Sequence, residues 1–194
     1  MRSDRYYEYL RWAPAIMRHA ATLASTLFNG SAYAAAHIRL ADAHWERTDC
    51  NHTINGVRVP SVSCGDGLNV INYTSLAQEM WHMMRQTETR VLYVATNMDC
   101  SDLRLERISK MLEQRAVRTV CAQELTRQEL GSDDNYFLSV IEQELCARAH
   151  TFIGSKYSTW TDTVSGMRLH NERPGNKWPG NNWLFEELYQ LGVK

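Results

Sequence analysis

The 194-residue sequence has no apolar run that approaches the roughly 18 residues needed to cross a membrane. It also has no excess of either charge, because 21 Lys and Arg residues stand against 22 Asp and Glu residues, giving a formal net charge of −1. That balance argues against a globally basic nucleic-acid-binding protein, although it leaves room for a local basic site. With 44% hydrophobic residues, the chain is expected to be soluble and to form one globular domain.

Several short enzyme motifs are also missing. The chain has no GxGxxG fingerprint and no Walker sequence, and Gly154 is too isolated to stand for either. It has no HExxH or GxSxG motif and no Cys–His arrangement typical of a nucleophile, so hydrolase chemistry finds little support. Five cysteines are present, without a CxxC pair or the Cys/His spacing of a structural zinc site.

Composition leaves the cellular compartment open. An odd number of cysteines would leave one thiol free, or cross-linked between chains, in an oxidising compartment. Three glycosylation sequons begin at Asn29, Asn51 and Asn72, but such triplets occur often by chance and are modified only in a secretory lumen. The apolar segment 13–28 is interrupted by a basic Arg-His pair and lacks a cleavage site, so it is not interpreted as a signal peptide.

Helical and strand-like periodicities alternate along the chain. Helices are expected at residues 6–27, 75–84, 101–112, 136–145 and 158–169. Strands are expected at residues 32–40, 90–96, 117–121 and 151–153. Asn29 is expected to end a helix, and Ser101 and the Asp133–Asp134 pair are expected to cap helices. This alternation is typical of βαβ units, so the fold class is predicted to be a single α/β domain with a parallel sheet.

Ligands of such sheets bind beyond the carboxyl ends of the strands, and His37 and Arg39 stand at one such end. Both side chains project from the same side of the strand, because side chains alternate with a period of two. The Arg39 guanidinium suits a phosphate, and His37 suits a hydrogen bond to a ribose or phosphate. By pattern alone the structural alternative is favoured, with Arg39 paired to a carboxylate and His37 at the rim.

A second strand end leads through Gly154 to Ser158 and Thr159 at the start of a helix. The first amides of a helix lack partners within it, and the positive end of its dipole favours an anion. The segment is therefore a candidate phosphate site. The equally weighted alternative is that Ser158 only caps the helix.

Other polar residues give weaker signals. Asn97 follows the expected strand 90–96, where a turn-forming role is preferred over ligand contact. Glu142 and Glu144 lie two residues apart on an expected helix and therefore point in different directions. His82 on a Met-rich helix is interpreted as structural rather than as a metal ligand.

Taken in order, these segments resemble the carboxyl-terminal half of the GDP-fucose protein O-fucosyltransferases. The resemblance covers roughly residues 5–170. It is carried by residues 9–12 (YLRW), 36–40 (AHIRL) with Trp45 and Cys50, 92–97 (LYVATN), 152–155 (FIGS) and 158–160 (STW). Each motif is weak alone, but their order within an α/β pattern is fairly specific.

The resemblance implies one half of a GT-B glycosyltransferase, in which two Rossmann-like halves face a cleft. Residues 1–30 would form a connecting helix and residues 31–170 the domain that binds the GDP-sugar. Residues 171–194, a tail rich in Gly, Asn, Pro and Trp, would pack on that domain, with a flexible loop as the alternative.

The resemblance also implies roles for individual residues. Arg39 matches the family arginine that contacts the diphosphate and favours departure of GDP, and His37 matches the histidine beside it. Ser158 and Thr159 match the hydroxyl pair at the diphosphate. Glu142 falls where related enzymes often carry an acidic residue near the nucleotide.

Two positions depart from the family pattern. Trp160 stands where Phe is common, so its packing must differ. Asn97 stands where many relatives have Asp.

The implied reaction is the inverting transfer of fucose from GDP-β-L-fucose to a Ser or Thr hydroxyl of a protein acceptor. No cofactor and no metal ion are expected, because Arg39 would take the place of a metal at the diphosphate. Family members act in the lumen of the endoplasmic reticulum or Golgi.

The main departure is length, since the upstream half and its acceptor elements are absent. The chain is therefore interpreted as a fragment or a truncated product. Its alternatives are a non-catalytic GDP-sugar-binding module or pseudoenzyme, and a structural or interaction domain without a nucleotide site.

Overall fold

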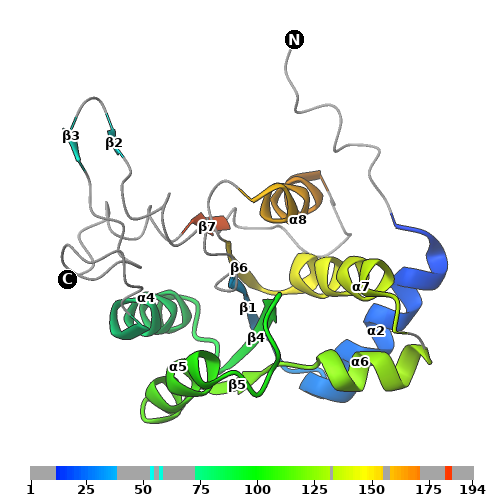
Figure 1. Cartoon of the computed structure of the whole chain (residues 1–194), viewed down its shortest axis with the longest axis horizontal. Helices are drawn as coiled ribbons and strands as arrows, with labels where there is room; N and C mark the ends of the chain where they lie inside the picture. Colours follow the sequence, from blue (N-terminus) through cyan, green and yellow to red (C-terminus); the bar gives the residue numbers. More distant parts are fainter. Residues whose placement is uncertain are drawn as a thin grey trace.

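A computed structural model describes residues 12–38, 53–54, 57–58, 73–131, 133–154, 158–170 and 182–184. Its centre is a parallel five-stranded sheet in the order β5-β4-β1-β6-β7 (Figure 1). The strands are β1 (Ala34–Ile38), β4 (Val91–Thr96), β5 (Arg118–Val120), β6 (Thr151–Gly154) and β7 (Asn182–Leu184). A small antiparallel pair, β2 (Thr53–Ile54) with β3 (Val57–Arg58), forms a separate sheet. The parallel α/β fold predicted from the sequence is confirmed.

Helices cover both faces of the sheet (Figure 1). They are α2 (Pro14–Phe28), α4 (Tyr73–Gln86), α5 (Leu103–Glu113), α6 (Gln123–Leu130), α7 (Asn135–Arg148) and α8 (Thr159–His170). Helices α4 and α5 share a core cluster with Ala34, Ala36 and Ile38 of β1. Helices α2, α7 and α8 share the other cluster with Ala35 of the same strand. Successive side chains of β1 thus point to opposite faces, which places His37 on the side of α7 and α8.

Local signals set several helix ends. Pro14 stands in the first turn of α2, where its missing N–H costs nothing, and Asn29 ends that helix in the left-handed conformation with φ 48°. Asp134 caps α7 by accepting from the N–H groups of Tyr136 and Phe137, as the sequence predicts for this acidic pair.

Two predicted helix starts are wrong by one or two residues. The cap of α5 is Asp102 rather than Ser101, whose N–H and hydroxyl instead donate to Asp99. Helix α4 begins at Tyr73, two residues before the start expected at residue 75. In α5, two neighbouring residues offer capping oxygens and only their side-chain geometry decides between them.

Helix α6, strand β7 and the antiparallel pair β2–β3 were not predicted. Helix α6 has few apolar residues, so its sequence QELTRQEL carries little periodic signal. Strand β7 lies in the Gly- and Asn-rich tail and forms by pairing with β6, a long-range contact. The proposed division at residues 30 and 170 stays a prediction. Within the described part of the chain, no helix is long and apolar enough to span a membrane.

Candidate functional site

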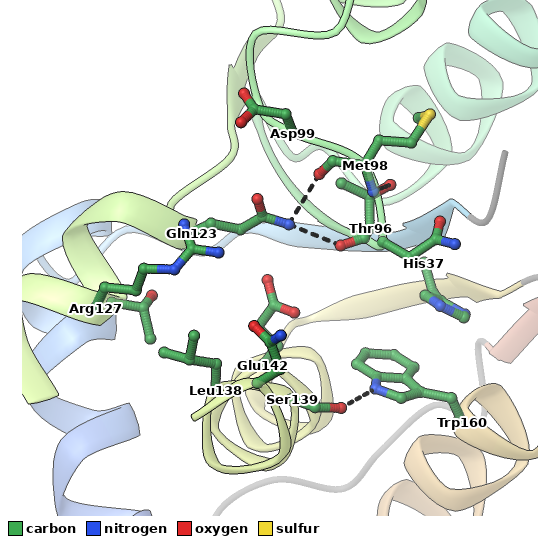
Figure 2. Close-up of a pocket in the computed structure, with 13 residues that line it drawn as sticks. His37, Thr96, Met98, Asp99, Gln123, Arg127, Leu138, Ser139, Glu142 and Trp160 are labelled. Carbon is green, nitrogen blue, oxygen red and sulfur yellow. Dashed lines mark hydrogen bonds between the residues drawn. The ribbon is translucent and has the colours of Figure 1, made fainter. Parts of the chain in front are cut away.

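A cavity of about 520 Å³ opens at the carboxyl edge of the sheet (Figure 2). Chain order explains its place, because the chain runs from β1 outward through β4 and β5 and then returns to the other side of β1 as β6. Such a reversal of strand order leaves a crevice beyond the strand ends, where doubly wound sheets bind ligands. The walls come from β1, the loop after β4, and helices α6, α7 and α8.

The lining residues are His37, Thr96, Asn97, Met98, Asp99, Gln123, Thr126, Arg127, Asn135, Leu138, Ser139, Glu142 and Trp160. A cavity of this size holds a small-molecule ligand.

His37 and Trp160 form a stacked aromatic pair in one wall. Their ring centroids lie 4.1 Å apart at an interplanar angle of 26°. The His37 Nδ1 lies 2.9 Å from the hydroxyl of Thr161, and the Trp160 indole N–H donates to the Ser139 hydroxyl at 2.9 Å. Both rings are therefore fixed by polar contacts at their edges, which leaves a flat surface of defined orientation.

Helix α8 approaches this edge closely because residue 154 is a glycine. A Cβ on Gly154 would collide with the side chain of Thr161 in the first turn of α8. Thr161 is the residue whose hydroxyl meets His37. Gly154 thus permits the packing that holds the aromatic pair in place.

Ser158 immediately precedes α8 and is buried, with 1% of its surface exposed. Its carbonyl accepts from the Asp162 N–H, as expected of a residue at the cap position. Its hydroxyl nevertheless has no hydrogen-bond partner among the residues that the structure describes. The Ser158 side chain therefore does not make the capping hydrogen bond considered as an alternative from the sequence. A buried hydroxyl without a partner, at a helix N-terminus, fits an anionic ligand.

Glu142 places a carboxyl group in the cavity wall. Its Oε1 accepts a hydrogen bond from the Tyr93 hydroxyl at 3.2 Å. Burial raises the pKa of the Glu142 carboxyl to about 8, against the opposing effects of the Tyr93 hydrogen bond and the Arg127 charge. Figure 2 shows the carboxyl between the side chains of Arg127 and Trp160.

The loop after β4 forms the opposite wall and is held by two long-range links. The Gln123 side-chain amide donates to the carbonyls of Thr96 and Met98 at 2.8 and 3.0 Å. A disulfide joins Cys100 to Cys121 and so ties this loop to the end of β5. Within the described residues, Cys146 is a free and buried thiol.

Asp99 and Arg127 bring further charge to the walls. Asp99 accepts from the N–H and hydroxyl of Ser101, which lowers the pKa of its carboxyl. The Arg127 Nε lies 4.0 Å from an oxygen of Asp133. In the described ranges, no group of three His, Cys, Asp or Glu residues is placed to hold a metal ion.

Of the residues singled out from the sequence, the structure brings His37, Asn97, Glu142 and Trp160 together in the cavity walls. Ser158 and Thr159 directly precede Trp160 at the start of α8. Arg39 lies outside the described residues, one position beyond the end of β1. The functional roles given to these residues remain predictions.

Sequence reasoning missed Gln123, Arg127, Ser139 and Tyr93. Gln123 and Arg127 belong to the unpredicted helix α6. No spacing in the sequence relates Tyr93 to Glu142 or Ser139 to Trp160, because both contacts join separate elements.

A parallel sheet whose strand order reverses at β1, with helices on both faces and a pocket at its carboxyl edge, is a doubly wound, Rossmann-like α/β fold. The family model for GDP-fucose protein O-fucosyltransferase matches residues 2–171, so the chain belongs to that family. The resemblance predicted from the sequence motifs is confirmed.

Solved structures of POFUT1 share this fold. The structure in complex with GDP has a TM-score of 0.65 at 18% identity, covering 94% of this chain and 51% of that chain. The complex with GDP-fucose has a TM-score of 0.66 at 19% identity, covering 94% and 49%. This chain thus spans about half the length of those proteins. No curated protein sequence matches the chain.

Proposed function

We propose that this chain is the donor-binding half of an enzyme that transfers fucose from GDP-fucose to Ser or Thr hydroxyls of protein acceptors. The observation that carries the proposal is the cavity at the carboxyl edge of the sheet, whose walls hold both the stacked His37–Trp160 pair and the Glu142 carboxyl. Family membership and the GDP-bound state of POFUT1 structures with this fold support the same conclusion.

The cavity suits a guanine base. The His37–Trp160 pair offers an aromatic surface on which a base stacks. Guanine presents two neighbouring N–H donors, at N1 and N2, which match the two acceptor oxygens of a carboxylate such as Glu142. Adenine lacks this pair of donors, so the site is expected to prefer GDP over ADP.

The diphosphate is assigned to the start of α8. The Ser158 hydroxyl and the first amides of the helix supply donors there, and the positive end of the helix dipole favours an anion. The guanidinium of Arg39 adds a fixed positive charge in this proposal, with Thr159 as a second hydroxyl.

The reaction follows from where charge develops. As the bond from fucose C1 to the β-phosphate oxygen breaks, negative charge accumulates on GDP, and the Arg39 and Ser158 donors stabilise that charge more in the transition state than before it. The acceptor oxygen attacks C1 from the opposite face and releases its proton to solvent, so the configuration inverts. We propose that this occurs without a metal ion or cofactor in the lumen of the endoplasmic reticulum or Golgi. Unchanged turnover in the presence of a strong chelator tests the metal-independent step.

A non-catalytic GDP-sugar-binding module is the second candidate. GDP binding without fucose transfer, in a protein that contains both halves, would support it over the enzyme.

Calorimetric titration of the chain with GDP tests the proposal, with ADP as the nucleotide control and Arg39→Ala as the comparison variant. GDP is expected to bind more tightly than ADP, and the variant is expected to lose this binding. At 100 times the dissociation constant, GDP should stabilise the fold by about 2.7 kcal/mol, which a thermal shift reports independently. A folded chain that binds neither nucleotide would overturn the proposal.

A further inference from the structure

Tyr93 is fully buried in β4, yet it carries a hydroxyl that the core packing does not require. The side chain has 0% of its surface exposed and packs edge-on against Phe28, with ring centroids 6.1 Å apart. A phenylalanine would fill the same space. A buried hydroxyl is costly unless it is hydrogen-bonded, and this one donates to Glu142.

The hydrogen bond constrains one oxygen of the cavity carboxyl. The Tyr93 O–H reaches Oε1 of Glu142 from the core side at 3.2 Å, which limits rotation of the carboxyl about its last bond. Figure 2 shows the carboxyl in the cavity near Arg127 and Trp160. Tyr93 of the sheet therefore holds one oxygen of the carboxyl from the core side, and the carboxyl is presented to a ligand in the cavity.

The same bond favours the ionised form of the carboxyl. Burial raises the pKa of Glu142, whereas the Tyr93 hydroxyl and the Arg127 charge from α6 lower it. The remaining titratable groups around it are the Cys146 thiol on its own helix, and His37 and Asp99 in the cavity walls. Tyr93 is the group among these that makes a direct hydrogen bond to the carboxyl.

We propose that Tyr93 is a positioning residue that holds the Glu142 carboxylate so that the cavity recognises the 2-amino group of guanine. This inference rests on the proposed function. A fixed carboxylate accepts from N1–H and N2–H of guanine together, whereas hypoxanthine keeps only N1–H. A carboxyl that rotates, or that carries a proton, loses one of these acceptors and with it the discrimination.

The test compares GDP, IDP and ADP binding to the unaltered chain and to Tyr93→Phe. At a pH above 8, where Glu142 is ionised, the unaltered chain should prefer GDP over IDP, and the variant should lose about tenfold of that preference, as expected for one hydrogen bond to a charged group. Tyr33→Phe is the matched control. The Tyr33 hydroxyl is also buried and donates to α7, but to the carbonyl of Leu145, so its loss should leave the GDP/IDP ratio unchanged.

A pH series adds a measurement that a purely structural role would not change. GDP affinity should rise with pH as Glu142 ionises, and the rise should move to higher pH in Tyr93→Phe, because the bond that favours the carboxylate is gone. In the Glu142→Gln background, Tyr93→Phe should have no further effect on the GDP/IDP ratio.

The outcomes separate the two claims. If the unaltered, folded chain binds no GDP, the proposed function fails and the inference falls with it. If GDP binds but Tyr93→Phe keeps both its GDP/IDP ratio and its pH profile, the inference alone is overturned. Equal losses in Tyr93→Phe and Tyr33→Phe would overturn it as well, since they would reflect only the packing of α7.

Discussion

Glu142 and Glu144 stand two residues apart on α7 and occupy contrasting surroundings. Glu144 is 2% exposed and pairs with Arg148 at 2.9 Å, and Arg148 also donates to the carbonyl of Met17 in α2. Glu142 faces the cavity and receives one neutral hydrogen bond from Tyr93. The helix therefore uses one acidic residue to join helices and presents the other to the cavity.

Two buried polar side chains, Arg168 in α8 and Ser158 directly before it, differ in the same way. Arg168 is 3% exposed, and its guanidinium donates to the carbonyls at the end of α7, where a helix leaves acceptors without partners. Among the residues that the structure describes, the equally buried Ser158 hydroxyl has no hydrogen-bond partner. Arg168 is therefore satisfied within the fold, whereas Ser158 retains a donor that a ligand can meet.

The largest effect is expected at Arg168, whose hydrogen bonds are made within the fold. Arg168→Met would leave the carbonyls of Cys146 and Ala149 buried without their donor and would remove the hydrogen bond to His150, so the free energy of unfolding should fall by about 4 kcal/mol. Urea denaturation measures it. Arg104→Met is the control, because its ion pair with Asp102 lies near the surface and should contribute at most about 1 kcal/mol. Equal losses in the two variants would contradict the comparison.

The two glutamates of α7 form a matched pair for the second prediction. Glu144→Gln should lower the free energy of unfolding by about 2 kcal/mol at pH 7, because it breaks a buried ion pair. Glu142→Gln should not destabilise the chain at that pH. Burial raises the pKa of Glu142 from 4.5 to about 8, so the folded chain holds a proton that the unfolded chain has released.

Because of this proton, the effect of Glu142→Gln on the free energy of unfolding depends on pH. The contribution of Glu142 to stability is present below pH 4.5 and is lost as the pH rises towards 8, so Glu142→Gln should reduce the fall in unfolding free energy by about 2 kcal/mol between pH 5 and 8. Glu79→Gln should also flatten the curve, since burial raises the pKa of Glu79 to about 9. Because Glu79 lies outside the cavity walls, it should leave GDP binding intact. Denaturation curves that coincide for Glu142→Gln and Glu144→Gln at every pH would refute the distinction.

The smallest effect on stability is expected at Ser158. Ser158→Ala should change the free energy of unfolding by less than about 0.5 kcal/mol, because the hydroxyl has no partner to lose, whereas removal of a working cap costs about 1 kcal/mol. GDP affinity should fall about tenfold, the loss of one charge-assisted hydrogen bond. A stability loss above 1 kcal/mol with unchanged GDP binding would identify Ser158 as a cap after all.

Much of the fold follows from local features of the sequence. The strand Val91–Thr96, the end of α2 at Asn29 and the cap Asp134 are predictable, because apolar runs and capping side chains act over a few residues. Helix α6 escapes prediction because its charged residues carry little periodicity, and its place depends on packing against α2 and α7.

The candidate site likewise has one part that the sequence predicts and another that depends on the folded chain. The sequence by itself determined that His37 lies near the end of a strand and that Asn97 and the segment before Trp160 follow strands of a parallel sheet, since strand order in α/β chains brings such ends to one edge. Only the tertiary structure decided their partners. The contact of His37 with Thr161 spans 124 positions and that of Tyr93 with Glu142 spans 49, and side-chain chemistry at such distances has no local signature. Whether a buried hydroxyl or carboxyl is satisfied depends on the packed neighbours, and these exist only once the chain has folded.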